Sequence, residues 1–197
     1  FYILQQADNP QVQDQIVIAL QELQNHPHFL LYLLEVINND DLPIKDRFNA
    51  SYLMQHSLRS CPFPETTKTL KLQLIPTLIP LLSISADDPL SSEFAISIAA
   101  LIAEAAIFYG VDIFSSTENI DQTIMNLLNP SNSPNTILTV LNLIHDLLNG
   151  NYDLNPEIIQ CFPQILEADI GLEVVILKVC ELFAQKGFSE IVKSVIL

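Results

Sequence analysis

The residues of this chain that could do chemistry are four histidines, three cysteines and two pairs of adjacent aspartates. Such groups bind metals or catalyse reactions only where several converge, and on a helix that requires spacings of three or four residues. His26 and His28 flank a proline, and His56 stands alone. His145 has Asp146 next to it, but adjacent residues of a helix point in different directions. The spacing therefore predicts no metal site.

The cysteines are Cys61, Cys161 and Cys180, an odd and widely spaced set without a C-x-x-C pair. This pattern favours free thiols in a reducing, intracellular compartment. The aspartate pairs at 40–41 and 87–88 stand shortly before prolines and are interpreted as caps and turn formers. Neither pair is followed by the helix-spaced second acid that a helical prenyl-diphosphate enzyme needs.

Motifs for nucleophilic or phosphate chemistry are missing from the sequence. There is no G-x-S-x-G and no glycine-rich phosphate loop, and the whole chain holds only 4 glycines. We therefore expect a protein that is not an enzyme and uses no cofactor.

The elements that must position these residues are all helical in pattern. The stretch 25–61 consists of an apolar run with helical period, a polar break at 38–41, and a second helix that begins at Pro43. One such helix pair cannot bury its apolar faces alone. We expect partners for it elsewhere in the chain.

Similar pairs recur, and we expect helical hairpins at 27–59, 66–109, 117–149 and 156–186. Their second helices start near Pro43, Pro89, Pro134 and Gly171, at spacings of 46, 45 and 37 residues. This period is typical of HEAT and armadillo repeats. The sequence thus predicts one all-α solenoid domain, a right-handed superhelix whose second helices line the inner surface.

Caps and breaks mark the expected helix ends. We expect N-caps at Asn9, Asp88, Thr117, Ser133 and Asn155, and stops at Gly110, Gly150 and Gly187. Prolines at 76, 80 and 163 should kink or break their helices. Because the chain opens on Phe1 and ends while still apolar, we expect it to be the N-terminal part of a longer array.

The charge is strongly uneven. The net charge is −15, and no Lys or Arg occurs between Lys71 and Lys178. Such a surface repels nucleic acid and attracts a basic peptide or protein. The alternative interpretation is that the acidity only confers solubility.

The segment 95–111 is almost continuously apolar but carries Glu104 near its middle and no basic residue close to either end. A membrane-spanning helix usually has Lys or Arg near one end. Burial on all sides within a stacked array explains the segment better, and we expect no membrane insertion.

The first 60 residues or so resemble the N-terminal region of the importin-β (karyopherin-β) family of nuclear transport receptors. The resemblance rests on residues 19–23 (ALQEL), 27–29 (PHF), 33–34 (LL) and 47–54 (RFNASYLM). The chain departs from the family pattern at Gln55 and His56, where Lys-Asn is usual, and at 61–63, where a Trp is frequent.

The resemblance implies a receptor that shuttles between cytoplasm and nucleus through the nuclear pore. Its implied partners are the GTPase Ran in its GTP form, basic cargo, and Phe-Gly nucleoporins. Arg47 is expected to be structural, paired with an acid or carbonyl of a neighbouring repeat. The polar residues of the second helices are the expected partner-binding set: Lys45, Asn49, Glu93, Asn142, Asp146, Glu173 and Glu181.

Two other classes remain as alternatives. One is a different HEAT or armadillo protein, such as a phosphatase scaffold or a vesicle-coat adaptor. The other is a helical enzyme or a membrane protein.

Overall fold

The computed structural model describes residues 13–84, 88–110, 114 and 120–196, with all of their side chains except those of 13–17, 20 and 196. Every regular element in these ranges is a helix, so the all-α prediction is confirmed for the described part of the chain. The caps expected at Asn9 and Thr117 lie outside the described residues.

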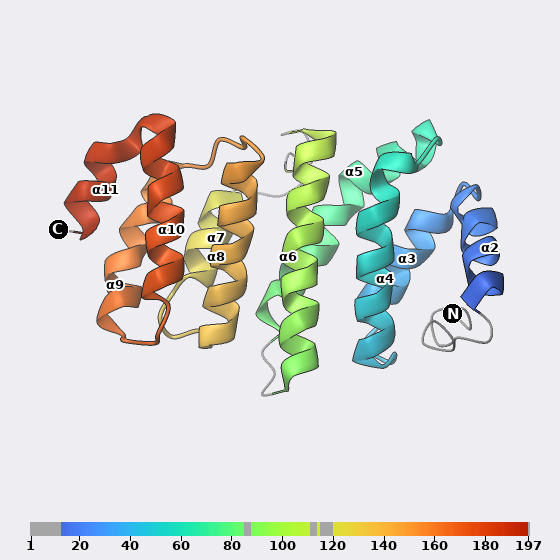
Figure 1. Cartoon of the computed structure of the whole chain (residues 1–197), viewed down its shortest axis with the longest axis horizontal. Coiled ribbons are helices and arrows are strands. Elements are labelled where there is room, and N and C mark those ends of the chain that lie inside the picture. The colour runs from blue at the N-terminus through green and yellow to red at the C-terminus, as the bar shows by residue number, and fades with distance from the viewer. Residues whose placement is uncertain (1–12, 85–87, 111–113, 115–119, 197) are drawn as a thin grey trace.

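The helices form two layers that run along the length of the molecule (Figure 1). The layer at the front of Figure 1 consists of α4 (Ile44–Ser57), α6 (Pro89–Tyr109), α8 (Pro134–Asn149) and α10 (Glu173–Phe183). The layer behind it consists of α3 (Phe29–Asn38), α5 (Pro64–Leu78), α7 (Ile120–Leu127) and α9 (Phe162–Glu167). Helices α2 (Gln13–Gln24) and α11 (Ser189–Ile196) stand at the two ends.

The four front helices all run in the same direction, with their N-terminal ends at the bottom of Figure 1. Helix α6 packs against α4 on one side and α8 on the other, and α8 in turn packs against α10. Each front helix therefore lies beside the corresponding helix of the next pair.

Side chains at the expected caps hold the starts of α6 and α8. The Asp88 carboxylate accepts hydrogen bonds from the Ser91 hydroxyl at 2.6 Å and from the Ser91 backbone N–H at 3.0 Å, and these bonds lower the Asp88 pKa. The Ser133 hydroxyl accepts from the Thr136 N–H at 3.1 Å. At the other end of α6, Gly110 adopts φ 78°, a left-handed conformation that glycine accepts without strain. These three predictions are confirmed.

The prolines shorten or divide the helices of the rear layer. Helix α5 tolerates Pro76 but ends at Leu78, and a 3-10 helix, Ile79–Ser83, carries Pro80. The helix expected from Asn155 to about Glu167 is divided into a 3-10 helix, Pro156–Cys161, followed by α9. Since Pro163 lacks an N–H, it cannot donate the α-helical bond across this junction.

Helix α10 starts later than expected. The sequence predicts that the second helix of the last hairpin starts near Gly171, yet α10 begins at Glu173 because Gly171 occupies a turn with φ 78°. Beyond Phe183 the chain makes one wide π-helical turn in which Gly187 has φ 98°. The stop at Gly187 is confirmed and the start near Gly171 is about two residues too early.

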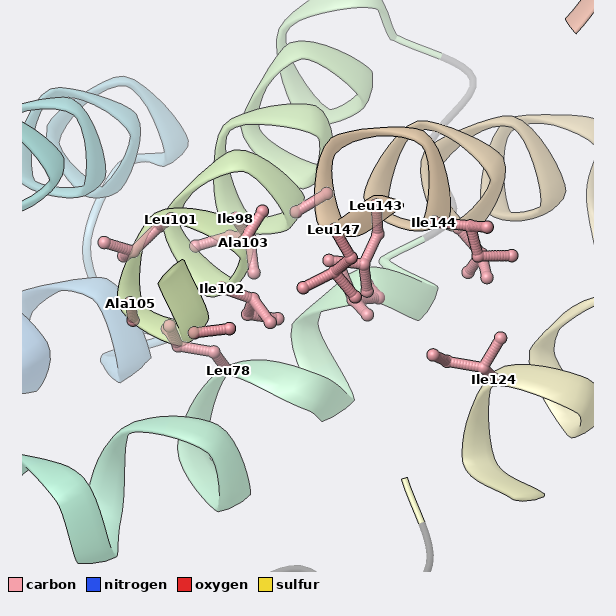
Figure 2. Packing of buried hydrophobic residues seen from close by; sticks show 14 of the residues in the cluster. Leu78, Ile98, Leu101, Ile102, Ala103, Ala105, Ile124, Leu143, Ile144 and Leu147 are labelled. Carbon is pink, nitrogen blue, oxygen red and sulfur yellow. The ribbon is translucent and has the colours of Figure 1, made fainter. Parts of the chain in front are cut away.

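The core lies between the layers and is apolar. Figure 2 shows Ile98 and Ile102 of α6 facing Leu143 and Leu147 of α8, with Leu78 of α5 below them. All five side chains are fully buried. Burying one such side chain stabilises a protein by roughly 1.5–3 kcal/mol, so this interface holds the layers together.

Helix α6 lies at the centre of both layers. By length and hydropathy it is the one helix of the described chain that could cross a membrane, with a mean hydropathy of 1.7 over its most apolar window, 56% of which is buried inside the protein. It contains five buried alanines, which keep it slim enough to contact α4, α5 and α8 together. Burial among these neighbours accounts for much of its apolar composition, but Ile96, Ile107 and Phe108 are exposed, so the expected burial on all sides is wrong.

Arg47 ties α3, α4 and α6 together from a buried position. Its Nε donates to the Ile37 carbonyl at 2.8 Å, and its Nη1 pairs with the Asp40 carboxylate at 2.8 Å. The guanidinium lies 5.0 Å from the centroid of the Phe94 ring on α6. The structural role matches our expectation, but the carbonyl and the acid belong to its own hairpin, and the neighbouring pair contributes an aromatic ring instead.

We predict that Arg47→Ala lowers the free energy of unfolding by about 2–4 kcal/mol, because it leaves the Ile37 carbonyl unpaired and opens a cavity. Arg59→Ala is the matched control, since Arg59 is exposed and its one ion pair among the described residues is with Glu104; it should cost about 1 kcal/mol or less. Urea unfolding measures both. Equal losses in the two variants would contradict the role given to Arg47.

Candidate functional site

The seven residues expected to bind partners all lie in the front layer. They are Lys45 and Asn49 on α4, Glu93 on α6, Asn142 and Asp146 on α8, and Glu173 and Glu181 on α10. Lys45, Glu93 and Glu181 are exposed, and the other four are half-buried. Thus the polar residues picked from the second helices do occupy one layer of the molecule.

The structure spreads these residues over a surface. Residues on the same helix can be close, as Asn142 and Asp146 are, one turn apart on α8. Glu93, in contrast, is the only one of the seven on α6. Four parallel helices carry the set across the front layer (Figure 1). Such an arrangement can make many weak contacts with an elongated partner and does not focus several groups on one reacting atom.

The exposed face of α6, α8 and α10, which we call the acidic helix surface, carries more acids than bases. Its acids include Glu93, Asp146, Glu173 and Glu181, and Lys178 is the one Lys or Arg in the three helices. The Asp146 carboxylate lies 3.0 Å from His145 Nδ1, and the amide of Asn149 contacts the same ring at 3.2 Å. This polar row runs along α8.

Exposed apolar side chains lie among the polar ones on the front helices, and we did not predict their exposure from the sequence. They are exposed by 36% to 66% of their surface: Tyr52, Ile96, Ile107, Phe108, Val174 and Leu177. The signal was present, because Tyr52 follows Asn49 by three residues and Leu177 follows Glu173 by four. Such mixed faces are typical of surfaces that bind proteins.

Two polar contacts fix α4 against α6 beneath this surface. The hydroxyls of Ser51 and Ser97 are 2.7 Å apart, and Ser51 is fully buried. At the C-terminal end of the pair, Arg59 forms an ion pair with Glu104. The relative position of the two helices is therefore set by hydrogen bonds as well as by apolar packing.

The groups with metal or nucleophile chemistry do not converge in the described part of the chain. No group of three or more His, Cys, Asp or Glu there could hold a metal ion. Burial raises the pKa of the Cys161 thiol, and it raises that of Cys180 to about 11. Both thiols consequently stay protonated, and unreactive, at neutral pH.

Burial also acts on two tyrosines. Burial, followed by the electrostatic effect of Cys61, raises the pKa of Tyr109 to about 12, and Thr67 has a smaller, opposite effect. Burial, followed by the charges of Asp121 and Asp153, raises the pKa of Tyr152. Tyr109 therefore keeps its proton in the folded protein well beyond the pH at which a free tyrosine loses its own, and the pKa of Tyr152 is shifted in the same direction.

These shifts predict a loss of stability in alkali. Cys180 titrates at about 11 when folded against 9.0 when free, and Tyr109 at about 12 against 10.0. As pH rises above 9.0 the unfolded chain therefore releases these protons first, and the free energy of unfolding falls until about pH 12.

The measurement is urea unfolding at several values of pH between 8 and 12. The double variant Tyr109→Phe with Cys180→Ala should show a shallower decline than the unaltered chain. Parallel declines would mean that neither group titrates abnormally in the folded state.

Comparisons of the chain with models of known families, with curated proteins and with solved structures find no match.

Proposed function

We propose that this chain is a segment of a HEAT- or armadillo-type solenoid that binds other proteins reversibly and without catalysis. The observation that carries the proposal is the layer of four parallel front helices, each following its own rear helix in the sequence. Stacked helix pairs of this kind present long surfaces made of equivalent helices. Right-handed superhelical curvature is part of the same proposal.

The start points of the front helices support a repeat. They are Ile44, Pro89, Pro134 and Glu173, close to the register expected from the sequence. A period of 40 to 47 residues belongs to the helix-pair repeats in general. The first three starts keep that spacing, and the last interval, from Pro134 to Glu173, is shorter.

Basic segments of partner proteins are the proposed ligands of the acidic helix surface. Glu93, Asp146, Glu173 and Glu181 would attract Lys and Arg side chains, chiefly by speeding association. The exposed aliphatic residues Ile96, Val174 and Leu177 would add apolar contacts around them. Many such contacts, each weak, give binding that is specific yet readily reversed.

Within this class we propose a nuclear transport receptor of the importin-β type. The support is the resemblance at 19–54 and the setting of Arg47, which joins α3 and α4 to the next helix pair. Its proposed partners are Ran-GTP, basic cargo and Phe-Gly nucleoporins, and its proposed location is the cytoplasm, the nucleus and the pore between them. A scaffold or adaptor of another family is the alternative.

Neutralising the acidic helix surface tests the binding of basic segments. The variant Glu93→Gln, Asp146→Asn, Glu173→Gln, Glu181→Gln should bind a labelled Lys/Arg-rich peptide about ten-fold more weakly in fluorescence anisotropy, since each exposed charge contributes about 0.2–1 kcal/mol. The matched control neutralises four exposed acids outside the front helices: Asp153, Glu157, Glu167 and Asp169. Equal weakening in both variants would show that only net charge matters.

Retention by GTP-loaded Ran tests the importin-type proposal separately. We expect the full parent chain to be retained by immobilised Ran-GTP and released when Ran holds GDP. Retention of basic peptides without any dependence on Ran would favour the scaffold alternative.

A further inference from the structure

A depression of about 460 Å³ opens beside the loop that leads from α4 to α5. Its walls are Cys61, Pro62 and Pro64 of the loop, together with Thr67, Lys68 and Lys71 of α5. Helix α5 belongs to the rear layer, so the lining residues are separate from the acidic helix surface. The volume is within the range of sites that bind small ligands or parts of peptides.

Positive charge gathers in this depression although the protein is strongly acidic. Two of the chain's 8 Lys and Arg residues line it, in a protein of net charge −15. Neither Lys68 nor Lys71 has a carboxylate within ion-pair distance among the described residues. Glu65, one turn before Lys68, is the acid nearest to it in the sequence. Both ammonium groups therefore remain available to an anionic ligand.

Tyr109 lies beneath the lysines. Its side chain is more than nine-tenths buried, and its hydroxyl has no hydrogen-bond partner among the described residues. Cys61 and Thr67, the two side chains that influence its ionisation, both line the depression. The Lys71 ammonium stands 5.7 Å from the centroid of the ring. The hydroxyl is closed to solvent and Tyr109 is not part of the lining, so the contribution of Tyr109 is its ring beside the Lys71 ammonium group.

The lining residues suit peptide carboxylates better than phosphate. Phosphate sites commonly use several backbone N–H groups, but Pro62 and Pro64 have none to offer. Lys68 and Lys71 are separated by one helical turn, which places their Cβ atoms about 5–6 Å apart. Side chains at positions i and i+2 of an extended peptide lie on one face, about 6.8 Å apart. Two carboxylates at that spacing match the two ammonium groups.

We propose that this depression binds an acidic segment of a partner protein in extended conformation, with two carboxylates two residues apart. One carboxylate pairs with Lys68 and the other with Lys71. The partner differs in charge from the basic segments proposed for the acidic helix surface. One chain would thereby hold partners of opposite charge on separate surfaces.

Fluorescence anisotropy of a labelled peptide containing Glu-Gly-Glu within a Gly/Ser sequence tests the site. Lys68→Glu with Lys71→Glu should weaken binding at least about ten-fold, because attraction becomes repulsion. The matched control, Lys186→Glu with Lys193→Glu, changes the net charge equally at the far end of the chain and should bind as the unaltered protein does. Circular dichroism checks that all variants fold.

Tyr109→Phe tests whether the two lysines alone carry the binding. It keeps the ring beside Lys71 and removes a hydroxyl that is closed to solvent, so the peptide should bind as it does to the unaltered protein. A several-fold loss of affinity in this variant would contradict binding by the lysines alone.

Specificity for the peptide is measured against a Glu-Glu-Gly peptide and against inorganic phosphate. Both should compete less well than Glu-Gly-Glu. Equal competition by phosphate, or equal affinity in the Lys68/Lys71 and Lys186/Lys193 variants, would overturn the proposal. The variant with a neutralised acidic helix surface should still bind this peptide, so failure of one site is distinguishable from failure of the other.

Discussion

Burial of apolar stripes between two helix layers is the constraint on which the rest of the structure depends. No pair of helices here can cover its own apolar faces, so each needs its neighbours. Helix α6 shows this most plainly, because Ile98, Ile102 and five alanines of this helix are buried where it packs against α4, α5 and α8. Once the pairs stack, the outward faces of the front helices are aligned automatically. A continuous surface for partners is a consequence of the packing.

Local sequence signals determined much of this fold and could be read without the structure. Asp88-Pro89 and Ser133-Pro134 start helices because a side-chain acceptor precedes a residue that needs no N–H partner. Contacts between residues that are far apart in the sequence were harder to predict. The partner of Arg47 on α6 could not be named, because Phe94 meets it only after the pairs have stacked. A kink or break at Pro163 was predicted, but the 3-10 helix that forms the segment before it was not.

The surfaces that could bind partners also depend on contacts between residues far apart in the sequence. Polar residues of the second helices could be chosen by helical period, and they do share one layer. Three exposed apolar residues, Ile96, Ile107 and Phe108, lie in the segment that we expected to be buried on all sides, since exposure depends on which flank a neighbour covers. The contact between Lys71 and Tyr109 could not be predicted from the sequence, because the two residues are far apart along the chain and meet only through the packing of α5 on α6. Two surfaces of opposite charge, one on each layer, follow from that packing.

The central claim is that the exposed face of α6, α8 and α10 binds basic segments of proteins. The most direct measurement is an NMR titration of the isotope-labelled chain with a Lys/Arg-rich peptide. The account predicts shifts that cluster on those three helices, include the side-chain amide of Asn142, and diminish as salt is added. Shifts confined to the rear helices α3, α5 and α9, or shifts that salt leaves unchanged, would contradict it.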